Sequence, residues 1–160
     1  MHPTLLDHIR GPHRFSLPRL IAPYLILSHF ISLSPLLSTL SFSYGEFTDR
    51  YIDENGAGTG LRLQLRTADI QQASVVFNGS TLGAASLPSS QLRGAWRKLT
   101  IRHTVNGLTV LLDSALLFDN LRLPGFQPTV RWRLAIGARC GSRNDLHQID
   151  DVHVHQGAAP

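Results

Sequence analysis

The sequence predicts an all-β protein built as an antiparallel β-sandwich, and three observations lead to this prediction. From Ser41 onward, short apolar runs alternate with polar residues and are separated by Gly, Asn, Asp and Pro, a pattern typical of strands joined by tight turns. Two Asn-Gly steps connect neighbouring runs, as in β-hairpins. No window after Ser41 keeps a 3.6-residue apolar period with capping residues, so helices are not expected there.

The first predicted strands show the clearest alternation. Residues 61–66 alternate strictly, which places their three leucines on one face of a strand. Residues 74–77 end at the Asn78-Gly79 step, and residues 81–85 follow it. These two segments are therefore expected to form a hairpin.

The later predicted strands complete the set. Residues 96–113 indicate a second hairpin that turns at Asn106-Gly107. In its first strand, one face carries Trp96, Lys98, Thr100 and Arg102, and the other carries Arg97, Leu99, Ile101 and His103. Further strands are predicted over residues 115–123, 131–137 and 149–155. Seven or eight short strands at this close spacing favour a sandwich, with Trp96 and Trp132 expected in its core.

Composition excludes several classes of protein. The chain has 160 residues, 42% hydrophobic and 16% charged, which suits one folded domain rather than a disordered tail. Its single cysteine, Cys140, rules out an internal disulfide framework. The net charge is +4, Lys98 is the only lysine, and the arginines are scattered. Nucleic-acid binding is not expected, because it requires clustered basic residues.

Residues 1–38 are unlike the rest, and we assign the sandwich domain to residues 39–157. No charged residue occurs from residue 20 to residue 40, which is long enough for a helix to cross a bilayer. Pro23, His29 and Pro35 interrupt this apolar segment. Three alternatives remain open: a signal or anchor, strands of the domain itself, or sequence that does not belong to the fold.

Three stretches in order carry a resemblance to a known family. They are residues 41–63, residues 96–113, and the segment from Leu123-Pro-Gly-Phe through residues 132–152. Together they resemble the concanavalin A-like lectin/glucanase superfamily, above all its laminin-G-like and legume-lectin-like modules, over about residues 39–155. Cys140 and Ser142 replace the usual Thr and Gly of the last stretch. The resemblance implies a jelly roll of two antiparallel sheets that lacks opening strands or replaces them with residues 1–38. It also implies carbohydrate binding or a cell-surface role, and calcium is common among its members.

The loop over residues 137–147 is the best candidate for ligand contacts. Asn144 and Asp145 offer oxygen ligands that suit calcium, with Asp150 as a third metal ligand. Asn144, Asp145 and His147 can also hydrogen-bond sugar hydroxyls, with Arg139 at the strand exit. The alternative is structural: Asn144 and Asp145 would stabilise their own turn, and Arg139 would pair with Asp150.

The closing strand, residues 149–155, bears on catalysis and on zinc. Alternation predicts Ile149, Asp151, His153 and His155 on one face, and Asp150, Val152 and Val154 on the other. Asp151, His153 and His155 are residue types that bind zinc, so a zinc site on this face is one alternative. The other alternative is an exposed polar face without a metal. Asp150 and Asp151 are adjacent and so are expected on opposite faces. The chain also lacks the alternating acidic pattern of a retaining glycosidase, so an enzyme is not expected.

These observations favour a non-catalytic carbohydrate-binding or cell-surface adhesion module. The alternative is a structural or protein-interaction module of the same fold with no small ligand. The expected partner is a glycan or an extracellular protein, and the expected location is secreted or cell-surface. Contact with a membrane is expected only through the possible N-terminal anchor.

Overall fold

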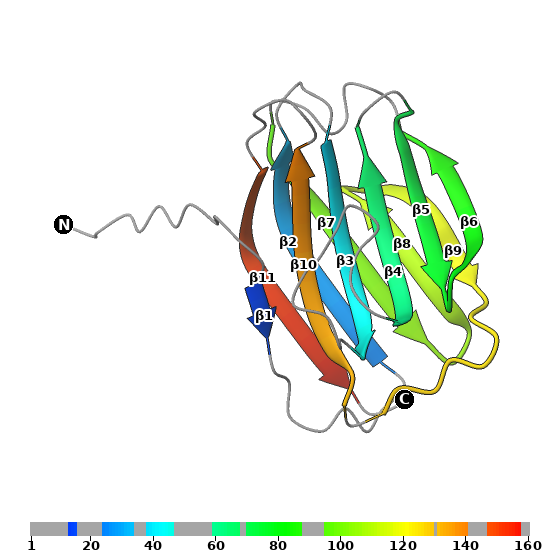
Figure 1. The fold of residues 1–160 in the computed structure, drawn as a ribbon. Coiled ribbons are helices and arrows are strands. Elements are labelled where there is room, and N and C mark those ends of the chain that lie inside the picture. Colours follow the sequence, from blue (N-terminus) through cyan, green and yellow to red (C-terminus); the bar gives the residue numbers. More distant parts are fainter. Residues whose placement is uncertain are drawn as a thin grey trace.

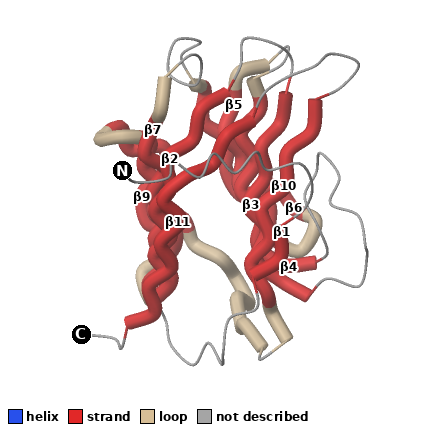
Figure 2. Tube along the Cα trace, turned by 90° about the vertical axis from the view of Figure 1, so that its left-hand side faces the viewer, coloured by secondary structure: helices blue, strands red, loops and turns tan. Residues whose placement is uncertain are grey.

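The protein is a sandwich of two antiparallel β-sheets (Figures 1 and 2). The computed structural model describes residues 13–15, 24–33, 38–46, 59–67, 70–87, 95–129, 131–140 and 147–157. Every regular element in these ranges is a strand, eleven in all. The predicted all-β sandwich is therefore confirmed.

Each sheet has its own order of strands. Sheet A runs β1-β10-β3-β4-β5-β6 and sheet B runs β11-β2-β7-β8-β9, with antiparallel pairing throughout. The strands of sheet A are β1 (His13–Phe15), β10 (Arg133–Cys140), β3 (Ser38–Glu46), β4 (Thr59–Arg66), β5 (Gln72–Phe77) and β6 (Ser80–Ser86). Those of sheet B are β11 (His147–Gly157), β2 (Tyr24–Leu33), β7 (Arg97–Thr104), β8 (Gly107–Leu112) and β9 (Ala115–Leu121).

Alternate side chains of both sheets fill the space between them. Phe42, Leu63 and Val75 lie opposite one another on β3, β4 and β5, and each is at most 3% exposed. Leu99 and Val110 face them from sheet B and are fully buried. Burial of one such side chain contributes about 1.5–3 kcal/mol relative to exposure. The alternation of apolar residues in the sequence thus corresponds to the alternation of buried side chains along the strands.

Both Asn-Gly steps lie at hairpins, but they occupy different positions relative to the turn. At the first, Asn78 and Gly79 have φ of 48° and 81° and connect Phe77 to Ser80, as a type I′ turn requires. At the second, Thr104 pairs with Gly107, so the turn lies one residue earlier than predicted. Gly107 has φ of 135°, and a Cβ there would lie 2.6 Å from the Asn120 carbonyl oxygen.

Two strands, β1 and β2, precede residue 39, the predicted start of the domain. β2 lies inside sheet B between β11 and β7, and β1 borders β10. Of the three alternatives for the apolar segment, residues 24–33 therefore adopt the strand. Pro23 and Pro35 flank this strand, which agrees with the exclusion of proline from central strands. A targeting role for residues 1–38 stays a prediction. Among the described residues, no helix is long and apolar enough to cross a membrane.

An aromatic cluster closes the end of the sandwich at which β9 leads to β10. Phe126, outside any strand, contacts Tyr44 and Phe77 of sheet A and His103 of sheet B, with ring centroids 6.3, 5.7 and 4.2 Å away. Trp132 meets Phe126 edge-on at 5.3 Å and packs against the core, as predicted. The prediction for Trp96 is wrong: it is 47% exposed, because it precedes β7 rather than lying inside a strand.

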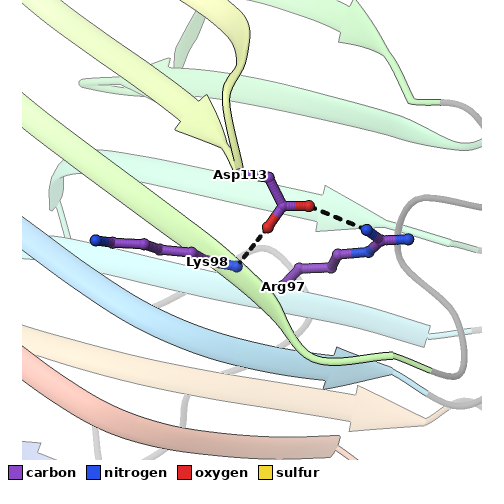
Figure 3. Close-up of polar contacts among 3 residues, drawn as sticks. All are labelled: Arg97, Lys98 and Asp113. Carbon is purple, nitrogen blue, oxygen red and sulfur yellow. Dashed lines mark hydrogen bonds and ion pairs between the residues drawn. The ribbon is translucent and has the colours of Figure 1, made fainter.

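Asp113 joins the start of β7 to the turn between β8 and β9 (Figure 3). Its backbone nitrogen donates to the Lys98 carbonyl oxygen at 2.6 Å, and its Oδ1 accepts from the Lys98 nitrogen at 2.9 Å. Its Oδ2 lies 3.1 Å from Nη1 of Arg97. Asp113 has φ of 54°, which Asp and Asn tolerate better than Ala.

We expect Asp113→Ala to lower the free energy of unfolding by about 2 kcal/mol, since it loses an acceptor and strains the backbone. Asp113→Asn is the matched control. It keeps an acceptor for Lys98 and tolerates the same φ, so it should lose well under half as much. Urea unfolding measures both values. Equal losses in the two variants would contradict the role given to the backbone contact.

A second prediction concerns Tyr44, which is 4% exposed and whose Oη has no hydrogen-bond partner among the described residues. Burial raises the pKa of Tyr44 to about 12 from 10.0. The neutral hydroxyl is therefore favoured in the folded state. Its contribution to stability is complete below the unfolded pKa and is lost as the pH rises toward the folded pKa.

Tyr44→Phe should be as stable as the wild type at neutral pH, or more stable by up to about 1 kcal/mol, because it removes a buried hydroxyl without a partner. The variant should also lose less stability than the wild type when the pH is raised above the unfolded pKa of tyrosine. Denaturant unfolding at neutral and alkaline pH checks both statements. A clear loss of stability at neutral pH would show that the hydroxyl has a partner.

Candidate functional site

The two outer faces of the sandwich differ in how much surface they offer. On sheet A, four polar side chains that alternate with the core residues, Ser41, Ser43, Gln64 and Ser74, are at most 8% exposed. Ser41 Oγ donates to the Gly137 carbonyl at 3.3 Å, and Ser74 Oγ donates to Gln64 Oε1 at 3.1 Å. The middle of this face therefore exposes little of these polar side chains, and the two hydroxyls have hydrogen bonds within the sheet.

Sheet B presents an open polar column on β7. Leu99 and Ile101 point into the core, so Lys98, Thr100 and Arg102 point outward by the alternation of the strand. Lys98 and Arg102 are exposed and Thr100 is half-buried. Asp113 holds the backbone of Lys98, whereas the Lys98 side chain extends away from that carboxylate (Figure 3). The column thus offers two cationic donors and a hydroxyl along one strand.

Neighbouring strands extend this face. Arg102 lies opposite Thr109 of β8, whose Oγ1 accepts from the Asn120 nitrogen at 3.3 Å. Thr100 lies opposite Leu111, and Leu111 lies opposite Leu116 of β9, which is 54% exposed. Polar groups on β7 are therefore bordered by apolar surface on β8 and β9. We name the outward side chains of Lys98, Thr100, Arg102, Thr109, Leu111 and Leu116 the sheet B face.

β11 adds acidic groups at the edge of the same sheet. Asp150 is aligned with Lys98 across Phe30, and His153 with Thr100 across Ser28. One strand lies between, so the backbones are about 10 Å apart. Asp151 Oδ1 lies 2.7 Å from Nε2 of His153, and both side chains are more than half exposed. The cationic column and the carboxylates are thus near each other without being paired.

The residues on each face of β11 differ from those predicted. Ile149, Val152 and Val154 all pack against the core, while Asp150 and Asp151 are both exposed. The predicted grouping of Asp150 with Val152 and Val154, and of Ile149 with His153, is wrong. The register shifts between Asp150 and His153, because one extra residue interrupts the alternation. Two polar residues in a row between Ile149 and Val152 were the signal of this shift.

Most of the predicted ligand residues lie where the structure gives no side chain. Asn144 and Asp145 lie outside the described residues. Arg139 lies near the end of β10 and His147 at the start of β11, and their side chains are not described. Asp150 is exposed, and its Oδ1 accepts from the Asp151 nitrogen at 2.7 Å. The predicted ligand and calcium sites therefore stay predictions.

Metal binding finds no further support in the described part of the chain. There, no group of three or more His, Cys, Asp or Glu side chains could hold an ion. Of the residues considered for zinc, the structure brings Asp151 and His153 together. The sheet B face was not predicted from the sequence, although Lys98, Thr100 and Arg102 alternate there with apolar residues.

Comparisons with known proteins concern the fold. No family model and no curated protein matches the sequence. Among solved structures, the Emp46p carbohydrate recognition domain in its potassium-bound form is similar, with a TM-score of 0.71 and 12% identity over 93% of this chain and 79% of that chain. For the Emp47p carbohydrate recognition domain the values are 0.70 and 11%, over 91% and 75%. For the carbohydrate-binding module CBM66 from Bacillus subtilis they are 0.51 and 10%, over 83% and 75%. The chain therefore has the lectin-like jelly-roll fold that its sequence resemblance implied.

Proposed function

We propose that this chain is a non-catalytic carbohydrate-binding module of a secreted or cell-surface protein, and that its glycan binds across the sheet B face. The observation that carries the proposal is the outward column of Lys98, Thr100 and Arg102 beside exposed apolar surface. In the middle of the sheet A face, Ser41, Ser43, Gln64 and Ser74 are at most 8% exposed, whereas Lys98 and Arg102 in the middle strand of sheet B are exposed, which favours sheet B.

The chemistry of this face suits a sugar. Sugar hydroxyls both donate and accept hydrogen bonds, and Lys98 and Arg102 supply donors while the threonine hydroxyls do both. Leu111 and Leu116 provide apolar area for the C–H surface of a ring. The similar structures are named for carbohydrate recognition or binding. Since a fold alone does not imply a function, the proposal depends on these side chains.

The carboxylates near this face suit binding better than hydrolysis. Glycoside hydrolysis requires two carboxyl groups on either side of the scissile bond. Here Asp113 is bonded to Arg97 and to the backbone of Lys98. Asp150 and Asp151 form a hydrogen-bonded unit with His153 at the edge of the sheet. This arrangement supports the non-catalytic part of the proposal.

The test is a glycan array with the full chain, followed by titration of the best glycan. Lys98→Ala and Arg102→Ala should each weaken binding about tenfold or more, as expected for loss of a hydrogen bond from a charged group. Arg66→Ala, an exposed arginine on sheet A, is the matched control and should bind like the wild type. Absence of any glycan ligand, or an equal loss in the Arg66 variant, would contradict the proposal.

Calcium is tested separately, because its predicted ligands are Asn144, Asp145 and Asp150. If calcium binds there, it should raise the melting temperature of the wild type, since a ligand of the native state stabilises it. Asp145→Ala should remove that rise. The measurement is thermal unfolding with calcium and with a chelator. Identical melting in both conditions would exclude a calcium site of useful affinity. It would not contradict the proposal that a glycan binds to the sheet B face.

A further inference from the structure

We propose that the edge of β11 with which no described strand pairs is a pairing surface for a second copy of this chain, and that one extra residue, Asp151, prevents that pairing. β11 is the end strand of sheet B, and β2 is its partner among the described strands. At eleven residues it is also a long strand. A long strand edge offers unpaired backbone groups to another chain. Such an edge needs a feature that prevents pairing in a protein that stays a single copy.

The extra residue is visible in the register of β11. Asp150 pairs with Phe30 and His153 with Ser28, so two residues of β11 lie opposite one residue of β2. This is a β-bulge. Asp151 has φ of 55°, a conformation that few residues other than glycine adopt. Ile149, Val152 and Val154 pack against the core on both sides of it. Asp151 is therefore the residue that stands outside the alternation.

Local hydrogen bonds occupy polar groups at the bulge itself. The Asp151 backbone nitrogen donates to Asp150 Oδ1 at 2.7 Å. The Asp151 carboxylate is bonded in turn to His153 at 2.7 Å. A backbone donor is thus taken by a side chain, and two exposed carboxylates stand at the middle of the strand. Bulges and charges at this position are what keep natural sheet edges from joining.

The occupant that fits this edge is the same strand of a second copy. Without Asp151 the strand alternates regularly, with Ile149, Val152 and Val154 toward the core. In antiparallel pairing about a two-fold axis at Val152, Ile149 of one copy would lie opposite Val154 of the other. Asp150 would lie opposite His153 in the same way. Apolar groups would meet apolar groups, and a carboxylate would meet an imidazole, so the edge is complementary to itself.

The experiment deletes Asp151 in the full chain and measures mass by light scattering after gel filtration, together with hydrogen exchange. We expect the wild type to be a monomer and the deletion variant to have twice that mass. Amides over residues 147–157 should exchange more slowly in the dimer. Asp151→Gly is the matched control, because it keeps the extra residue and adopts the positive φ freely. It should remain a monomer.

Each other result would overturn the proposal. A folded deletion variant that stays monomeric shows that the bulge blocks nothing. A dimeric Asp151→Gly variant shows that the carboxylate, and not the extra residue, is the barrier. A wild type that is already dimeric with protected β11 shows that the edge is open. If the deletion variant does not fold, hydrogen exchange of the wild type at rising protein concentration replaces it. Exchange over residues 147–157 that does not change with concentration is expected for a closed edge, and protection that grows with concentration refutes the proposal.

Discussion

The structure depends on the packing of alternate apolar side chains between sheets A and B. Because successive side chains of a strand point to opposite sides, this packing decides at once which residues are buried and which are outward. It places Leu99 and Ile101 inside and thereby sets Lys98, Thr100 and Arg102 on the surface. It also requires a bulge wherever the sequence leaves the period of two, as it does at Asp151.

The parts of the fold that depend on neighbouring residues could be predicted from the sequence. The hairpins at Asn78 and Asn106 carry their own turn signals, and residues 61–66 carry their alternation. β2 was one of three alternatives, because its residues do not alternate strictly and its partners β7 and β11 lie far along the chain. Pairing between distant segments leaves no local signature, and the domain boundary set at residue 39 followed from that.

The residue types of the candidate site could be predicted from the sequence, but their location on sheet B could not. The outward residues of β7 follow from alternation alone. The low exposure of Ser41, Ser43, Gln64 and Ser74 on sheet A favours sheet B as the binding face. The polar character of these four residues does not predict that burial. Two consecutive aspartates between apolar residues indicated the bulge in β11. Strict alternation across these two residues gave the incorrect grouping of Asp150 with Val152 and Val154.

Because of Phe126, the two ends of the sandwich differ in how the two sheets are held together. It belongs to a connecting segment, yet its ring contacts residues of both sheets. The segment between β9 and β10 therefore links the two sheets. Any sliding of one sheet over the other would break the ring contacts of Phe126. The opposite end has exposed apolar side chains at Ile70 and Trp96. A domain fused beside Ile70, which is exposed, would leave the Phe126 contacts in place.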